Sequence, residues 1–349
     1  MSAQGATQIS KAKLDVGIVG LGKMGILHAG IVNSLSNGRV KAICEKEGMI
    51  VKAAKKILPN IPFYESVEEM LSQETLDAVF ITTPLQTHVS IVKTILDSNE
   101  NVGLFVEKPL AANGDDAREI AQLASDKDII NIVGLQKRFS PVFQRAKLLL
   151  ESGSIGDLQF FKGYNYVSDI FREGEGWRFR KGSGGALLDL GPHILDLLLW
   201  YLGELRPLSA VQRSFYSSEV EDYVHVVLET PSGVLGTVDV SWSIRGYRLP
   251  EIIIEIHGTN GAMVVTDDYV RIQTDAQAKG AVAREAQTIQ KTSLDSSVEF
   301  LLADPEFTIE DKYFLESVGS KKAAQPDFRT AANLNQMIDL LHQMAEKGS

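Results

Sequence analysis

Residues 14–25 read LDVGIVGLGKMG, and this stretch decides the fold of the first part of the chain. The run LDVGIVG (14–20) is short and apolar and ends in glycine, which is typical of a strand buried in a parallel sheet. Residues 23–36 then carry apolar side chains at helical spacing, namely Met24, Leu27, Ile31 and Leu35. The stretch therefore predicts a strand, a glycine turn and a helix in immediate succession.

The glycines of this turn match the pattern G-x-G-x-x-G over residues 20–25. Gly20 allows the tight turn, Gly22 lets the backbone approach a pyrophosphate, and Gly25 lets the helix pack closely on the strand. Free N–H groups at the helix start, beside Lys23 and Met24, then face the phosphates. A glycine-rich turn without a ligand is the alternative, but the position between strand and helix favours a dinucleotide site.

The same alternation continues outward from the glycine turn. Further strands are predicted at 39–45, 77–83, 102–107 and 129–135, with helices between them at 48–58, 87–98 and 115–126. Strands separated by helices of this length indicate a parallel sheet covered on both faces. We therefore predict a doubly wound Rossmann domain over residues 1–136.

Beyond residue 136 the pattern changes to strict alternation. In 234–242 one face carries Val234, Gly236, Val238, Val240 and Trp242. This predicts an antiparallel strand with one exposed face. Further strands are expected at 158–167, 222–229, 251–257 and 262–266, and helices at 310–318 and 330–346. We expect residues 137–349 to form an α+β domain with a large, open, mostly antiparallel sheet.

An acid follows the second predicted strand, where a dinucleotide site needs one. Glu45 stands twenty positions after Gly25, and a carboxylate there accepts hydrogen bonds from ribose hydroxyls and repels a 2′-phosphate. This favours NAD over NADP. Lys46 follows directly and would attract that phosphate, so NADP stays open.

Composition limits the class of protein further. The 349 residues are 44% hydrophobic and 23% charged, which is ordinary for a globular chain of two domains. The net charge of −10 disfavours nucleic acid and anionic membranes as partners. One cysteine, Cys44, excludes an intrachain disulfide and a multi-cysteine zinc site, and no metal site is predicted. Residues 1–13 lack the apolar segment of a signal peptide, so we expect a cytoplasmic protein without a membrane span.

Two more motifs give the chain a family resemblance. Glu107-Lys108-Pro109 ends a predicted strand, and residues 184–196 read GGALLDLGPHILD. Together with the glycine turn, these motifs resemble the Gfo/Idh/MocA oxidoreductases, the family of glucose–fructose oxidoreductase and inositol dehydrogenase. The family often has three glycines before the aspartate stretch; Ser183 holds the first of these places here.

The resemblance implies a Rossmann domain, a second domain with a large open sheet, a nicotinamide cofactor and a sugar, cyclitol, sugar acid, nucleotide-sugar or related polyhydroxylated substrate. It places catalysis on Lys108, Asp189 and His193, and substrate binding on Arg178, Asp189 and His193. The expected cofactor-binding residues are Gly20, Gly22, Lys23, Met24, Gly25, Glu45, Thr83, Pro84, His88, Glu107 and Lys108.

Elementary chemistry agrees with the three catalytic residues. Hydride removal from a secondary alcohol needs a base for the hydroxyl proton, and histidine titrates nearest neutrality. Lys108 is suited to hydrogen-bond the substrate oxygen. Asp189 and His193 are four residues apart and share a face if this segment is helical. Asp196 either completes that face or is a structural acid.

The sequence thus predicts an NAD(P)-dependent oxidoreductase that acts on a secondary hydroxyl or its ketone. The alternative is a dinucleotide-binding sensor or regulatory protein on the same fold. The open sheet predicts a homodimer or homotetramer, since a half-apolar sheet needs a cover. A cis peptide at Lys108–Pro109 is a further hypothesis, because cis bonds occur mainly before proline.

Overall fold

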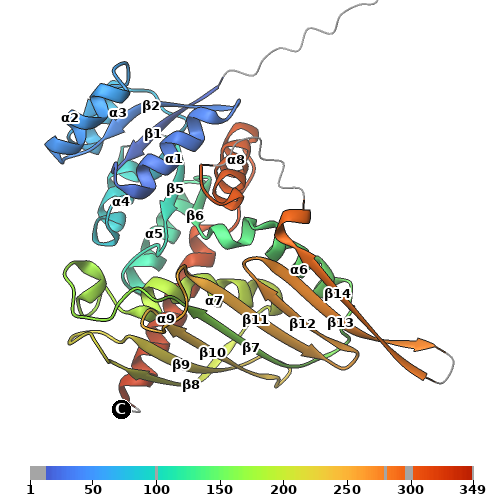
Figure 1. Cartoon of the computed structure of the whole chain (residues 1–349). Helices are drawn as coiled ribbons and strands as arrows, with labels where there is room; N and C mark the ends of the chain where they lie inside the picture. The colour runs from blue at the N-terminus through green and yellow to red at the C-terminus, as the bar shows by residue number, and fades with distance from the viewer. Residues whose placement is uncertain (1–12, 99–100, 279–280, 295–301, 348–349) are drawn as a thin grey trace, which may run out of the picture.

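The computed structural model describes residues 13–98, 101–278, 281–294 and 302–347. Two sheets dominate it, one of six strands and one of eight (Figure 1). Residues 1–12, where no signal peptide is expected, lie outside the described residues. Within the described ranges, no helix combines the length and apolar character that crossing a membrane requires.

The six-stranded sheet has the order β3-β2-β1-β4-β5-β6, and all of its neighbouring strands are parallel. Its strands are β1 (Leu14–Val19), β2 (Gly38–Cys44), β3 (Phe63–Tyr64), β4 (Ala78–Ile81), β5 (Gly103–Glu107) and β6 (Asn131–Gly134). The predicted Rossmann sheet is confirmed, and the short β3 was not predicted. The strand order reverses between β1 and β4, which is where open α/β sheets bind ligands.

Helices cover both faces of this sheet. They are α1 (Lys23–Ser34), α2 (Gly48–Ile57), α3 (Val67–Gln73), α4 (His88–Asp97) and α5 (Gly114–Asp126). Successive residues of β1 show the two covered faces. Ile18 packs in the core that contains Phe314 of the late helix α8 (Pro305–Ser320), and Val19 packs in the core that contains Ile95 of α4. The sheet is therefore apolar on both sides, as its uninterrupted hydrophobic runs predict.

The eight-stranded sheet has the order β14-β13-β12-β11-β7-β10-β9-β8. Its strands are β7 (Leu158–Tyr166), β8 (Arg206–Arg213), β9 (Tyr223–Glu229), β10 (Leu235–Ser241), β11 (Glu251–Gly258), β12 (Gly261–Thr266), β13 (Tyr269–Ala278) and β14 (Ala281–Gln290). All neighbours are antiparallel except β7 and β10. The mostly antiparallel sheet is confirmed; β8, β13 and β14 were not predicted.

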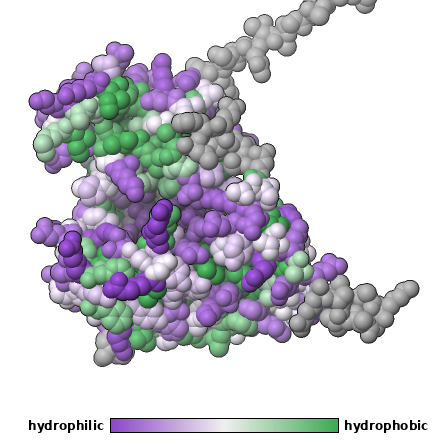
Figure 2. Space-filling view, in the orientation of Figure 1, coloured by the Kyte–Doolittle hydropathy of each residue, from purple (hydrophilic) through white to green (hydrophobic). Residues whose placement is uncertain are grey.

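Among the residues that the structure describes, helices cover one face of this second sheet and leave the other open. α7 (Ala186–Leu202) packs against β7, β9 and β10, and α6 (Pro141–Glu151) packs against β12 and β13. Val238, Val240 and Trp242 are fully buried on that side, as the alternation predicts, and Leu235 on the other side is half exposed. Figure 2 shows hydrophilic side chains interrupted by hydrophobic ones over the lower part of the molecule.

Two helices late in the chain return to the first sheet (Figure 1). Phe314 and Leu315 of α8 (Pro305–Ser320) lie fully buried in the core beneath β1 and β4. α9 (Phe328–Lys347) packs along α5 and reaches β8 of the second sheet. Residues from beyond 136 thus complete the cover of the Rossmann sheet.

Candidate active site

The glycine turn has the geometry that a phosphate requires. Gly20 has φ +88°, and a Cβ on Gly25 would lie 2.0 Å from the Gly20 carbonyl oxygen, so neither position accepts a side chain. Around Gly22 nothing lies within 4 Å of a Cβ position. No side chain of the described residues caps the start of α1. Open space beside an uncapped helix N-terminus suits an anion.

Glu45 is tied to this turn by hydrogen bonds. Its Oε2 accepts the Leu21 N–H at 2.6 Å, and its Oε1 accepts the Glu47 N–H at 2.8 Å. A carboxylate oxygen has two lone pairs, so each oxygen keeps one for a ribose hydroxyl. The sequence predicted the position of Glu45 but not its contact with the glycine turn, because no spacing rule describes such a contact.

A cavity of about 300 Å³ lies at the carboxyl ends of β4 and β5. It brings together six of the residues expected to bind the cofactor, namely Met24, Thr83, Pro84, His88, Glu107 and Lys108. Trp177 and Phe307 also line it. Phe307 comes from α8 and was not predicted, because only the fold carries that distant segment to this wall.

His88 lies behind this wall with 1% of its surface exposed. Its Nδ1 is 3.0 Å from the Pro109 carbonyl oxygen, and its Nε2 is 2.9 Å from the Thr83 carbonyl oxygen. Burial lowers the pKa of the ring, although the carbonyl contacts oppose this. His88 therefore lies between two segments of the cavity wall, and its neutral ring donates to one of the two carbonyl oxygens.

Lys108 and Asp189 meet across the two domains. The Lys108 Nζ donates to the Asp189 carbonyl oxygen at 2.7 Å and to its Oδ1 at 3.2 Å. The Asp189 Oδ2 pairs with Arg178 Nη2 at 2.9 Å. Burial acts to raise the pKa of Asp189, but the two cations outweigh it and lower the pKa below its ordinary value. Asp189 is therefore an ionised carboxylate that holds both cations.

His193 lies one turn after Asp189 on α7. Its buried Nδ1 has no hydrogen-bond partner among the described residues. Burial, with the positive charges of Lys108 and Lys137, holds the pKa of His193 well below its ordinary value. The ring is neutral at neutral pH and is able to accept a proton.

Arg178 also contacts residues that follow two strands of the second sheet, β7 and β10. Its Nη1 pairs with Asp169 at 2.8 Å, and its guanidinium lies 5.0 Å from the Trp242 ring centroid. Asp196, by contrast, does not reach the cluster. Its carboxylate is held by Arg138 through two hydrogen bonds of 2.7 and 2.6 Å, so it is a structural acid.

The glycines before α7 explain why Ser183 is tolerated. A Cβ on Gly184 would lie 2.0 Å from the Arg178 carbonyl oxygen, and Gly185 has φ +103°. Ser183 is not among the described residues with positive φ. The two glycines that the backbone requires are therefore present. The Lys108–Pro109 peptide is cis, as hypothesised.

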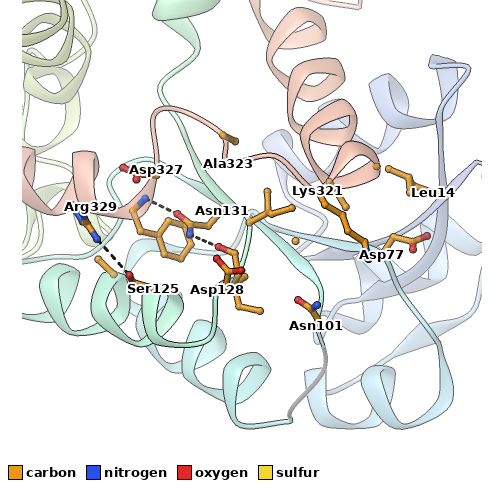
Figure 3. Close-up of a pocket in the computed structure, with 18 residues that line it drawn as sticks. Leu14, Asp77, Asn101, Ser125, Asp128, Asn131, Lys321, Ala323, Asp327 and Arg329 are labelled. Carbon is orange, nitrogen blue, oxygen red and sulfur yellow. Dashed lines mark hydrogen bonds between the residues drawn. The ribbon is translucent and has the colours of Figure 1, made fainter.

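A larger cavity, about 520 Å³, lies at the opposite edge of the Rossmann sheet (Figure 3). Its walls come from the starts of β1, β5 and β6 and from the segment between α8 and α9. Asp77, Lys321 and Arg329 bring charges of both signs to it. None of the predicted site residues lines this cavity. The size of a cavity therefore does not identify the active site of this protein.

Comparison with known proteins assigns both halves of the chain. Residues 14–135 match the model of an oxidoreductase family with an NAD-binding Rossmann fold, GFO_IDH_MocA. Residues 143–264 match the GFO/IDH/MocA C-terminal domain.

Two curated relatives cover most of the chain. Inositol 2-dehydrogenase of Corynebacterium glutamicum (strain R) is 27% identical over 244 residues, 68% of this chain and 69% of the relative. The NAD(+) form of scyllo-inositol 2-dehydrogenase from Bacillus subtilis (strain 168) is 28% identical over 273 residues, 76% of this chain and 77% of the relative.

Among solved structures, levoglucosan dehydrogenase in complex with NADH and levoglucosan superposes with a TM-score of 0.85. The match has 22% identity and covers 97% of this chain and 98% of that one. At this identity the likeness shows the shared two-domain fold.

Proposed function

Because this chain belongs to the GFO/IDH/MocA oxidoreductase family, we propose that it uses NAD to oxidise a secondary hydroxyl of a small polyhydroxylated molecule, or to reduce the matching ketone. One observation carries the proposal. Lys108, which lines the cavity at the carboxyl edge of β4 and β5, meets Asp189, and Asp189 meets Arg178. His193 lies one turn after Asp189 on α7, where the charge of Lys108 helps to lower its pKa. Open α/β sheets bind their ligands at this edge.

The residues present fit a dinucleotide. The gap around Gly22 admits a pyrophosphate against the start of α1, and Glu45 stands beside it with lone pairs for the adenosine ribose. The cavity between Thr83 and Lys108 then receives the nicotinamide half. The preference for NAD over NADP rests on Glu45.

When bound, the nicotinamide accepts or donates the hydride. The chain's own residues handle the proton and the oxygen. Two of the three Nζ protons of Lys108 go to Asp189, which leaves one for the substrate oxygen. Neutral His193 takes the hydroxyl proton as the hydride leaves, and Asp189 keeps Lys108 and Arg178 in place.

The substrate class follows from the relatives and from the site. The curated relatives are named for inositol, scyllo-inositol and D-apiose. Arg178, Asp189, Lys108 and His193 together offer donors and acceptors suited to several hydroxyl groups on one ring. Arg178 is the residue we assign to substrate binding alone.

We place the protein in the cytoplasm, and we propose that it forms a homodimer or homotetramer. The assembly would bury the uncovered face of the eight-stranded sheet. Phe160 on β7 is 45% exposed on that face and stacks on His257 at 4.1 Å. Leu235 on β10 is 50% exposed. Apolar side chains on an open sheet favour a cover by a second copy.

Turnover tests the function directly. Purified protein and NAD are incubated with a panel of cyclitols, aldoses and sugar acids, and formation of NADH is followed by absorbance. We expect oxidation of at least one polyol, and Lys108→Ala and His193→Ala should each lower kcat by about 10²–10⁴-fold. NAD affinity should stay nearly unchanged in His193→Ala, because His193 belongs neither to the glycine turn nor to the lining of the cavity.

Two results would contradict this proposal. NAD binding without turnover on any member of the panel would favour the sensor. Near-wild-type kcat in Lys108→Ala would remove the lysine from the mechanism.

A further inference from the structure

Three acids of α8 are buried behind the cofactor cavity, outside the residues assigned so far. Glu306 and Asp311 are fully buried, and Glu310 is 1% exposed. A buried carboxylate costs several kcal/mol unless it is paired or neutral. The charge of each acid therefore depends on the groups that it faces.

Asp311 faces His28 of α1, which is also fully buried. The His28 Nδ1 lies 2.9 Å from both Asp311 carboxylate oxygens. Its Nε2 lies 3.1 Å from the Glu107 Oε1. Burial raises the pKa of Asp311, and the interaction with His28 opposes this. Ionised carboxylates only accept hydrogen bonds, so when both carboxyl groups are ionised the two ring nitrogens donate and the ring carries a positive charge.

The pKa values of His28 and of the neighbouring Glu310 agree with a positively charged His28 ring. Burial alone would lower the pKa of His28, but the Asp311 and Glu107 carboxylates outweigh it and raise the pKa to about 10. Burial, with the negative charges of Asp311 and Glu107, holds the pKa of Glu310 well above its ordinary value, so Glu310 is neutral.

Glu306 and two aromatic rings complete these surroundings. Glu306 pairs with Lys137 and Lys291 instead of His28. The rings of Phe80 and Phe105 lie 5.5 and 4.8 Å from the imidazole and shield it from water.

Glu107 connects this pair to the cofactor cavity. While its Oε1 faces His28, its Oε2 accepts the Lys108 N–H at 3.1 Å, and the residue lines the cavity. Both oxygens are thus fixed, and each keeps a lone pair. A carboxylate held in this way accepts hydrogen bonds from ribose hydroxyls or from a carboxamide.

We propose that Asp311 and His28 are positioning residues that hold the Glu107 carboxylate in one orientation at the wall that receives the nicotinamide half of the cofactor. The proposal rests on the proposed function, because it takes the cavity between Thr83 and Lys108 as the nicotinamide site. α8 therefore serves the cofactor site although it lies about 200 residues further along the chain than Glu107.

A pair of neighbouring substitutions on α8 tests the proposal. Asp311→Asn removes the charge that faces His28, and Glu310→Gln is the matched control, since it changes an acid that is already neutral. Calorimetric titration with NAD should show affinity about tenfold weaker in Asp311→Asn and unchanged in Glu310→Gln. Equal affinities in all three proteins would overturn the proposal. Absence of NAD binding in the wild type would contradict the proposed function instead.

The pH dependence separates positioning from packing. In Asp311→Asn the loss of one carboxylate should bring the titration of His28 into the neutral range, and NAD affinity should then fall as His28 loses its proton. A merely structural effect would weaken binding equally at every pH.

The wild type provides a test that does not depend on folding of the variant. Nitrogen-15 NMR of its histidines, with His28 assigned through His28→Gln, should show a ring still protonated at about pH 8. Deprotonation near the ordinary histidine value would overturn the proposal.

Discussion

Gly22 combines an ordinary backbone with empty surroundings. Its φ of −72° suits any residue, and a Cβ there would meet no atom within 4 Å. The protein itself therefore does not require glycine at this position. A ligand that approaches the backbone at Gly22 would require glycine there. Gly20 and Gly25 differ, because the protein's own backbone excludes a side chain at those two positions.

Gly22→Val should separate cofactor binding from folding. We expect NAD affinity to fall at least about tenfold, because the new side chain would occupy the space of the pyrophosphate. The melting temperature without NAD should stay near that of the wild type. Calorimetric titration and a thermal melt measure the two effects; unchanged NAD affinity would contradict the assignment.

Glu45 accepts the Leu21 N–H, and we propose that the same carboxylate binds the ribose of the cofactor. Glu45→Ser should narrow the preference for NAD over NADP, because repulsion of a 2′-phosphate disappears with the charge. Glu45→Gln is the matched control, since its amide oxygen still accepts one backbone hydrogen bond while the charge is gone. Both variants should raise the ratio of the KM for NAD to the KM for NADP. An unchanged ratio would mean that the Glu45 carboxylate does not face the adenosine ribose.

At the scale of one element, the start of α7 depends on a carboxylate from the segment between β8 and β9. Glu221 Oε1 accepts the buried Leu187 N–H at 2.9 Å, and the Glu221 carbonyl oxygen accepts the Ala186 N–H. His342 of α9 pairs with the same Oε1 at 3.4 Å. The first turn of the helix that carries Asp189 and His193 is thus anchored from outside the helix.

This anchor predicts a pH-dependent stability. Burial acts to lower the pKa of His342, but the Glu221 carboxylate outweighs it and raises the pKa. A group with a raised folded-state pKa stabilises the fold fully below its unfolded value, about 6.5, and loses that effect as the pH rises through the folded value.

His342→Gln should therefore cost about 0.5–1 kcal/mol of unfolding free energy at about pH 6 and less at about pH 9. Urea melts of both proteins at each pH measure the difference, in which all other titrating groups cancel. A cost that stays constant across the range would contradict the role of the charged pair.

Elements with regular periodicity were predictable, and the contacts that assemble the site were not. Residues 14–20 and 234–242 carry their structure in local apolar patterns, and both became strands as predicted. The β13–β14 hairpin was missed because it carries few large apolar side chains, although Val270 and Ile272 of β13 do alternate with Arg271 and Gln273. The hydrogen bonds that Glu45 accepts from the glycine turn and that Asp196 accepts from Arg138 depend on the packing of distant segments, which no local pattern encodes.

At the scale of the whole molecule, the described residues leave one face of the larger sheet without a covering helix. Phe160→Glu should dissociate an assembly that buries this face, because a charge would enter an apolar contact. Leu340→Glu on α9 is the matched control, since Leu340 is 41% exposed on a helix instead of the sheet. Sedimentation velocity should show a smaller species for Phe160→Glu alone; equal masses for both would place the interface elsewhere.

The return of α8 and α9 to the first sheet has a consequence for biosynthesis. Domains generally fold in order as a chain leaves the ribosome. Here the residues that close the Rossmann core, Phe314 and Leu315, are translated after the entire second sheet. The first domain of a nascent chain therefore keeps one apolar face of its sheet exposed until α8 has been translated. We expect chaperones to bind ribosome-bound chains that stop before α8.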